Sequence, residues 1–552
     1  METRMHAVPY RGADLLVRTL ADAGVDTIFT LSGNHIMPLF DACVDAGIRL
    51  IHTRHEAATV HMADAYARIT GKVGIALVTG GPGHANAVAA LYTTAQAESP
   101  VILLSGHASL HQLGMGAFQE MRQADIAAPL VKASWTAQTA AGLAEDIARA
   151  FVTAQSGRPG PVHLSLPIDL LEAQLTAPVA LDTTAFVPTL EIPDAAVMAA
   201  ILTQLQRAAK PLILVGPALL TRRGRSLCAE LETATGVPVV GMESPRGIGD
   251  PCLGAFGEVL AQADTILLLG KRLDFTLKFG QAPAINAKAV VMHIDADESE
   301  LARTQHAFEA RLHHQAVADA HTAAHALVAV ASRTPTIAET TPWRSEVHAA
   351  VVFRPAAWAS AVSQTSGRVH PAAAFRPLQD LLDSHPDSVL VVDGGEIGQW
   401  AQACLSAPHR VINGIAGSIG AALPFAAAAR VAVPHAPVVA VLGDGTFGFH
   451  SSELDTAVRY DLDFIAVVGN DARWNAEYQI QVRDYGRDRT IGCELLPTRY
   501  DKVAVAFGGH GEFVTEASAM TAAVKNAVAS GLPACINVMI EGLAAPNIKR
   551  PA

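Results

Sequence analysis

Two apolar runs that end in polar residues constrain the fold of this chain more than any other feature. The run at 439–442 leads into Gly443-Asp444-Gly445, and the run at 464–469 leads into Asn470-Asp471. Residues 452–458 between them have a helical pattern, with Ser451 or Ser452 as the expected N-cap. This order predicts a parallel βαβ unit, in which both strand ends lie at one edge of the sheet and Asp444 meets Asp471. Carboxylate oxygens beside glycines suit Mg²⁺ that holds a diphosphate, while an ordinary βαβ unit with polar strand ends is the alternative.

The spacing of these residues resembles the diphosphate-binding motif of thiamine diphosphate (ThDP) enzymes, which runs Gly-Asp-Gly, a spacer of similar length, and Asn-Asn. The chain departs from that motif at Asp471, which still offers an oxygen and adds a negative charge. The resemblance implies a cofactor contact by Gly443, Asp444, Gly445, Thr446, Asp471, Trp474 and Asn475. It also implies that Mg²⁺ is held by Asp444, Asp471 and the backbone carbonyl of Arg473.

A second motif, at 53–68, resembles the helix that carries the activating glutamate of the same enzymes, and Glu56 stands at that position. In the family this glutamate bonds to the pyrimidine N1′ and drives the 4′-amino group into the imino form that takes the C2 proton. The apolar neighbours Ala57, Ala58 and Val60 would disfavour its charged form. A zinc-binding His-Glu-x-x-His helix is excluded, because position 59 is Thr. A solvated glutamate at a helix start is the remaining alternative.

A third motif follows the apolar run 73–78, where the glycine-rich segment 79–86 resembles the family loop that borders the pyrimidine. It implies cofactor contacts by Gly81, Pro82 and Asn86. The three motifs occur in family order, and the resemblance spans nearly the whole chain. The group it indicates is the acetolactate-synthase-like ThDP enzymes, which also includes benzaldehyde lyase, oxalyl-CoA decarboxylase and 2-hydroxyacyl-CoA lyase.

Composition sets broader limits. A chain of 552 residues with 50% hydrophobic residues is expected to form about three domains. Its net charge of −12, without a basic block, argues against nucleic-acid binding. Six scattered cysteines fit a reducing compartment, the N-terminus does not resemble a signal peptide, and the apolar region 420–443 is interrupted by Arg430 and His435. We therefore expect a cytoplasmic protein that binds neither membranes nor nucleic acids.

Apolar runs alternate with amphipathic segments throughout, which predicts an α/β protein with three doubly wound parallel-sheet domains. We place a pyrimidine-binding domain at 1–176, a Rossmann-like middle domain at 194–332 and a diphosphate- and Mg²⁺-binding domain at 369–552, with links at 177–193 and 335–368. Middle-domain runs end at Gly216, Gly270 and Asp295, but no G-x-G-x-x-G is present. FAD or ADP is therefore not expected there. The resemblance implies a homodimer or homotetramer, with one cofactor shared between two subunits.

Further site residues come from the resemblance. His35 and Gln119 match residues of benzaldehyde lyase that exchange protons with the substrate oxygen. Gly417 and Ile419 match the loop that bends the cofactor into a V shape, and Gly394, Gly395 and Glu396 are expected beside it. Glu477 matches a proton-relaying glutamate, and Ile480 replaces the substrate-gating Trp of biosynthetic acetolactate synthases. The alternatives are a loop histidine with a backbone partner for His35, core packing for Ile419 and a solvated side chain for Glu477.

Together these features predict a ThDP- and Mg²⁺-dependent carbon–carbon lyase or carboligase that acts on a small molecule, a 2-oxo acid or 2-hydroxy ketone, through a C2-enamine. A 2-hydroxyacyl-CoA lyase or oxalyl-CoA decarboxylase is the enzymatic alternative. A non-catalytic cofactor-binding subunit is the alternative of another class. Glu56 argues against it, because binding alone does not need that residue.

Overall fold

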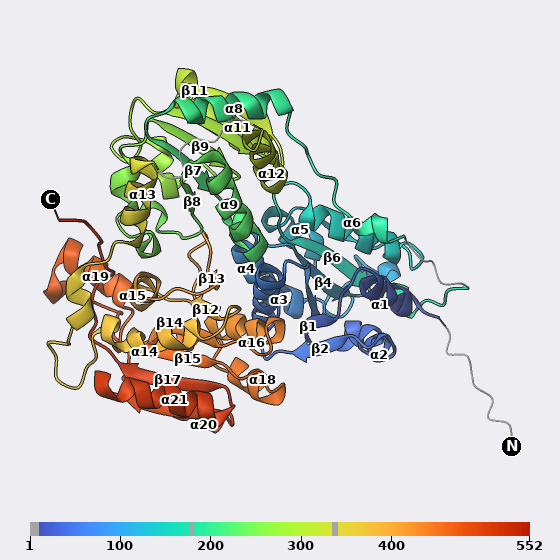
Figure 1. The fold of residues 1–552 in the computed structure, drawn as a ribbon. Coiled ribbons are helices and arrows are strands. Elements are labelled where there is room, and N and C mark those ends of the chain that lie inside the picture. The colour runs from blue at the N-terminus through green and yellow to red at the C-terminus, as the bar shows by residue number, and fades with distance from the viewer. Residues whose placement is uncertain (1–9, 177–181, 334–340, 552) are drawn as a thin grey trace. The chain divides into compact units, whose positions relative to one another are not determined.

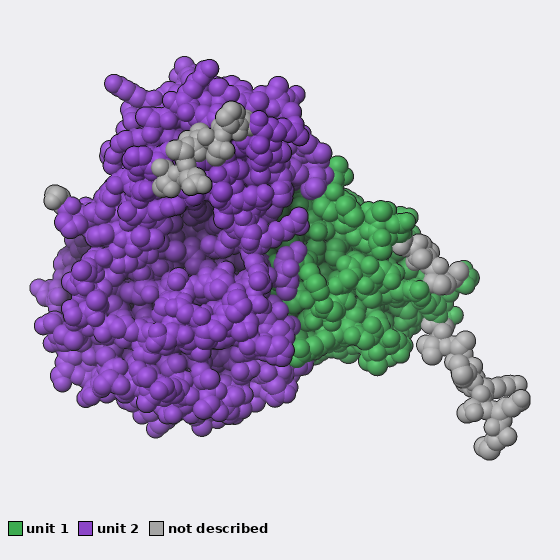
Figure 2. Space-filling view, viewed as in Figure 1, with its two compact units in different colours: residues 1–67, 72–189 green, residues 68–71, 190–552 purple. Residues whose placement is uncertain are grey.

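Three parallel β-sheets organise the chain in the computed structural model, which describes residues 10–176, 182–333 and 341–551. The chain forms two compact units, residues 1–67 with 72–189 and residues 68–71 with 190–552 (Figure 2). The first unit contains one sheet and the second contains two. Helices flank each sheet (Figure 1). The predicted fold class is therefore confirmed.

The first unit contains a six-stranded sheet in the order β2-β1-β3-β4-β6-β5. Its strands are β1 (Thr27–Leu31), β2 (Arg49–His52), β3 (Gly74–Val78), β4 (Val101–His107), β5 (Ser134–Thr136) and β6 (Val162–Pro167). The helices are α1 (Gly12–Asp22), α2 (Met37–Ala46), α3 (Glu56–Thr70), α4 (Pro82–Gln96), α5 (Gln123–Ala127), α6 (Leu143–Gln155) and α7 (Ile168–Glu172). Every residue of β3 and β4 is buried, as expected for parallel strands covered on both faces.

The second unit begins with a five-stranded sheet in the order β11-β10-β9-β7-β8. Its strands are β7 (Pro211–Val215), β8 (Val239–Gly241), β9 (Thr265–Leu269), β10 (Val290–Asp295) and β11 (Leu312–Val317). Its helices are α8 (Ala195–Arg207), α9 (Arg222–Thr235), α10 (Phe256–Leu260), α11 (Glu298–Phe308), α12 (Ala320–Ala331) and α13 (Pro342–Val352). Leu212 and Leu214 enter one hydrophobic core and Ile213 and Val215 another, because alternate side chains of a strand point to opposite faces.

The last sheet of the second unit has the order β13-β12-β14-β15-β17-β16. Its strands are β12 (Val389–Val392), β13 (His409–Ile412), β14 (Val438–Gly443), β15 (Ile465–Asn470), β16 (His510–Val514) and β17 (Ala534–Met539). Its helices are α14 (Pro371–Asp383), α15 (Glu396–Cys404), α16 (Ala422–Ala432), α17 (Asp444–Phe447), α18 (Glu453–Arg459), α19 (Asn475–Tyr485), α20 (Tyr500–Ala506) and α21 (Met520–Ser530).

Two local expectations differ from the structure. The link expected at 335–368 contains α13, whose Trp343, Val347 and Ala350 join a core of the middle sheet; residues 334–340 lie outside the described ranges. Ser452 is the N-cap residue of α18, but its side chain makes no capping hydrogen bond. The domain boundaries themselves stay a prediction, although each sheet lies within one predicted domain.

After β17 an extended C-terminal segment, residues 541–551, crosses the second unit. The carbonyl of Leu543 accepts a bond from Asn475 Nδ2 (2.9 Å), and Ala545 N donates to Glu396 Oε2 (3.0 Å). Further on, Arg550 donates to Glu258 (2.7 Å) and Glu346 (2.6 Å) beside the middle sheet. This segment therefore joins the two sheets of the unit.

Across the three described ranges we find no helix with the length and apolar character needed to cross a bilayer.

Candidate active site

The carboxyl ends of β12, β14 and β15 place the predicted diphosphate residues at one edge of the last sheet. The chain reverses its direction of growth between β12 and β14, because β13 lies on one side of β12 and β14 on the other. Such switch points are where open α/β sheets bind ligands. Gly443 of β14 pairs with Gly469 of β15, so Asp444 and Asp471 follow neighbouring strand ends. The predicted convergence of these two residues is present.

One hollow at this edge collects most of the predicted residues. It is lined by Gly395, Glu396, Ile419, Gly443, Asp444, Gly445, Thr446, Asp471, Arg473, Trp474, Asn475 and Glu477, with Ile397, Gly469 and Ala476. Segments separated by more than seventy positions in the sequence therefore form one surface. The roles of these residues stay predictions.

The two aspartates of this hollow repel each other in a poorly solvated place. Burial raises the pKa of Asp444 to about 6, although the N–H groups of Gly445 (3.0 Å) and Arg473 (3.2 Å) donate to its carboxylate. Burial and the charge of Asp444 raise the pKa of Asp471 to about 7. The positive charges of Arg473 and Arg368 oppose this rise in the pKa of Asp471 without cancelling it. Two desolvated carboxylates side by side therefore favour a bound positive ion.

The donor set suits Mg²⁺ held jointly by protein and diphosphate. No group of three or more His, Cys, Asp or Glu side chains that could hold a metal occurs in the described part of the chain. The site offers two carboxylates, and within the described ranges no hydrogen bond reaches the carbonyl oxygen of Arg473. Mg²⁺ commonly binds through one or two carboxylates, with phosphates and water as its other ligands. The residues present therefore fit this ion.

Glycines shape the cradle around the aspartates. A Cβ at Gly445 would lie 2.5 Å from the indole ring of Trp474, so only glycine lets that ring pack on the turn. Gly394 has a φ of +87°, and a Cβ there would approach Gly443 N to 3.0 Å. The close backbone approach that the Gly-Asp-Gly motif predicts is thus a property of this site.

Other predicted residues of the last sheet occupy distinct positions. Ile419 is 38% exposed, which excludes simple core packing. Glu477 is also exposed, whereas Glu396 is buried and its carboxylate lies 3.7 Å from Arg246. Asn475 donates to Leu543 and accepts from Gln479 (3.1 Å), so its amide already has two partners.

In the first unit, Glu56 lies against the predicted pyrimidine loop. It begins α3, and its Oε2 accepts a bond from Asn86 Nδ2 (3.0 Å). A Cβ at Gly83 would lie 3.5 Å from Glu56 Oε1, so α4 presents a bare backbone to this carboxylate. The structure thus brings Glu56, Gly83 and Asn86 together, and the catalytic role of Glu56 stays a prediction.

His35 follows β1 and packs against β4, where a Cβ at Gly106 would lie 2.6 Å from His35 Cβ. It is 3% exposed, its Nδ1 lies 3.2 Å from Thr79 Oγ1, and burial lowers its pKa. Its ring stacks on Phe118 with centroids 6.1 Å apart. The next residue, Gln119, has a φ of +57° and touches Gly81, where a Cβ would lie 2.7 Å from the Gln119 carbonyl. His35 and Gln119 therefore flank the glycine-rich loop.

Two buried residues that sequence reasoning missed bind backbone groups near the predicted site: Gln123 at the glycine-rich loop and Asp393 at residues 420–422. Gln123 accepts from Gly81 N (2.8 Å) and donates to Gly106 O (3.1 Å). Asp393 accepts from Gly420 N (2.8 Å) and Ala422 N (3.0 Å). Asp393 ends an apolar run and precedes two glycines, much as Asp444 lies between two glycines at the end of another run. This similarity is the sequence feature from which a role for Asp393 could have been predicted.

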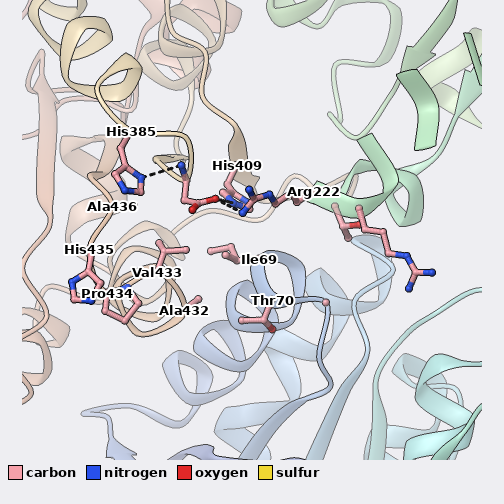
Figure 3. A pocket seen from close by; sticks show the side chains of 14 residues that line it. Ile69, Thr70, Arg222, His385, His409, Ala432, Val433, Pro434, His435 and Ala436 are labelled. Atoms are coloured by element: carbon pink, nitrogen blue, oxygen red, sulfur yellow. Dashed lines mark hydrogen bonds and ion pairs between the residues drawn. The ribbon is translucent and has the colours of Figure 1, made fainter. Parts of the chain in front are cut away.

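A larger cavity, of about 630 Å³, lies at the opposite, amino-terminal edge of the last sheet (Figure 3). His385 and His435 precede β12 and β14 there, His409 begins β13, and Arg222 pairs with Asp387. None of the predicted site residues lines it. We therefore assign the site to the carboxyl-terminal edge.

Comparison with known proteins identifies the family. Three family models match: thiamine pyrophosphate enzyme, N-terminal TPP binding domain, at residues 10–126; the central domain of the same enzymes at 198–327; and the C-terminal TPP binding domain at 393–538. The chain belongs to the thiamine pyrophosphate enzyme family, and it is a ThDP-dependent enzyme.

Its relatives cover nearly the full chain. It is 32% identical to a probable acetolactate synthase of Mycobacterium bovis, over 97% of this chain and 96% of that protein. It is 30% identical to 2-hydroxyacyl-CoA lyase 2 of Danio rerio, over 92% of this chain and 87% of that protein. The acetolactate synthase large subunit of Parasynechococcus marenigrum is 28% identical, with 96% and 87% covered.

Proposed function

We propose that this protein is a ThDP- and Mg²⁺-dependent carbon–carbon lyase or carboligase that acts on 2-oxo acids or 2-hydroxy ketones. The observation that carries the proposal is the desolvated pair Asp444 and Asp471 in a glycine-lined cradle, because paired carboxylates favour a cation and a bare glycine backbone suits the close approach of a phosphate. The relatives named acetolactate synthase support the same chemistry.

ThDP supplies a thiazolium that stabilises negative charge at the carbon from which a bond breaks. The protein then needs residues that bind, orient and move protons. We assign metal binding to Asp444, Asp471 and the Arg473 carbonyl, and packing of the cofactor to Trp474 and Ile419. Glu56, oriented by Asn86, would hold the proton that activates the pyrimidine.

His35 and Gln119 would exchange protons with the substrate oxygen. Burial lowers the pKa of His35, which keeps its imidazole neutral and able to accept a proton near pH 7. Glu477, exposed at the rim of the hollow, would relay protons to solvent. We also propose a cytoplasmic location, supported by six free cysteines, and assembly as a homodimer or homotetramer.

The proposal is tested first at Glu56. Glu56→Gln should leave ThDP bound but abolish exchange of its C2 proton with deuterated water, followed by NMR. Glu145→Gln, which changes an exposed glutamate in the first turn of α6, is the matched control and should exchange normally. Unchanged exchange in Glu56→Gln would remove that residue from the mechanism, and a wild-type protein that takes up no ThDP would refute the proposal.

A second candidate, a 2-hydroxyacyl-CoA lyase, is favoured by the relatives of that name. The holoenzyme should be incubated with pyruvate, benzoin and a 2-hydroxyacyl-CoA while CO₂ and aldehyde release are followed. Turnover of pyruvate or benzoin alone supports the first function. Aldehyde released only from the acyl-CoA would support the second.

A further inference from the structure

Asp393, which follows β12, has a buried carboxylate that accepts four hydrogen bonds and is only 2% exposed. Its Oδ1 accepts from Gly394 N and Asn413 Nδ2, both at 2.5 Å. Its Oδ2 accepts from Gly420 N (2.8 Å) and Ala422 N (3.0 Å). All four donors are neutral. A buried carboxylate is costly to desolvate, and here three backbone N–H groups and one side-chain amide replace the lost water.

The donors belong to three different loops. Gly394 is in the turn after β12, Asn413 follows β13, and Gly420 and Ala422 lead into α16. The same Asn413 amide also donates to the carbonyl of Ser418. The N-cap residue of α16, Ala421, has no side-chain acceptor, so Asp393 supplies the cap from another strand. Asp393 and Asn413 thereby hold the residues on both sides of Ile419.

The 417–420 loop that Asp393 and Asn413 hold has a backbone conformation that requires glycine at two positions. Gly417 and Gly420 have φ values of +66° and +100°, and a Cβ at Gly420 would lie 2.6 Å from Phe449 Cβ. Between these glycines Ile419 turns outward, 38% exposed, and lines the hollow shared with Asp444. The position of Ile419 in that hollow is therefore set by the loop and not by packing of its own side chain in a core.

We propose that Asp393 is a positioning residue that fixes the 417–420 loop, and with it Ile419, against the 394–396 turn. It thereby sets the conformation in which ThDP is held for loss of its C2 proton. This inference rests on the proposed function. Asp393 is not among the residues that line the hollow, so it acts through Ile419, which is.

The test is a double-mutant cycle with Asp393→Asn and Ile419→Ala. Asparagine has the shape of aspartate, but its amide nitrogen turns two of the four acceptor contacts into donor–donor contacts. In the ThDP- and Mg²⁺-saturated holoenzyme, each single variant should slow C2 proton exchange roughly tenfold to a hundredfold, the range that small misplacement causes. The double variant should be no slower than the slower single variant, because both changes remove the same positioning. Asp463→Asn, at a half-buried aspartate paired with Arg430, is the matched control.

The exchange rate of saturated protein does not depend on how much of the sample is folded, so global destabilisation cannot imitate the expected result. Normal exchange in Asp393→Asn, or effects of the two changes that multiply, would overturn the inference. If Asp393→Asn does not fold, Asn413→Ala carries the test, because it removes the bridge to Ser418; normal exchange in that variant would overturn the inference as well. A wild-type protein without exchange would instead refute the proposed function, and the inference with it.

Discussion

Replacing Asp471 with asparagine tests the metal site through the stability of the metal-free protein. The pKa of Asp471 in the folded protein is about 7, against 3.8 for the ordinary side chain. Between these values the unfolded chain has lost the proton while the folded protein keeps it. Stability therefore falls as the pH rises through this window. Above pH 7 the folded state is weakened by on the order of 4 kcal/mol.

Asp471→Asn keeps the shape of the side chain and removes the charge. At pH 8 and without metal, the variant should resist unfolding of this domain better than the wild type, by roughly 2 to 4 kcal/mol. Near pH 4 the two proteins should be alike, because the wild-type carboxyl is then protonated in the folded state. Mg²⁺ should stabilise the wild type more than the variant, since it offsets two carboxylate charges in one protein and one in the other.

Thermal unfolding of each protein, with EDTA or with Mg²⁺ and without ThDP, at pH 4 and pH 8, measures all these differences. Asp463→Asn serves as the control for loss of a charge in the same domain. Equal unfolding midpoints of variant and wild type at pH 8 without metal would refute the reasoning. So would equal stabilisation of both proteins by Mg²⁺.

Three other outcomes are expected. Glu56→Gln and Asp444→Ala subunits should each be inactive alone and should recover about a quarter of wild-type activity when mixed. Half of a random dimer population is mixed, and one of the two sites in each mixed dimer is intact. No recovery would contradict sites shared between subunits. Gly445→Ala should bind ThDP roughly tenfold to a hundredfold more weakly by calorimetry, since its Cβ would lie 2.5 Å from Trp474. Gly448→Ala, where the nearest atom lies at 3.4 Å, should bind normally, and equal binding by both variants would exclude the steric explanation. Burial lowers the pKa of His84 from 6.5 to about 4, so its contribution to stability is complete above pH 6.5 and is lost toward pH 4, about 3 kcal/mol in all. The thermal midpoint of His84→Gln should therefore fall less between pH 7.5 and pH 4.5 than that of the wild type or of His111→Gln. An unchanged fall would show that other groups govern acid unfolding.

Sequence reasoning predicted the sheets and the convergence of Asp444 with Asp471, because buried parallel strands leave long apolar runs and their ends share one edge. It could not find the partners of Asp393, which depend on loops that return to it from β13 and from the start of α16. It also missed α13, because the Pro- and Thr-rich residues before this helix are typical of a linker. Trp343 and Val347 of α13 pack against the core of the middle sheet. The features that could not be predicted are thus those that depend on tertiary contacts and leave no local pattern in the sequence.

The C-terminal segment has a practical consequence. Arg550 binds Glu258 and Glu346 near the end of this segment. Earlier residues of the same segment contact Glu396 and Asn475 beside the cradle. A change that displaces Arg550 from Glu258 and Glu346 would therefore also disturb the backbone that contacts Glu396 and Asn475, so a loss of activity can originate far along the chain from the cradle.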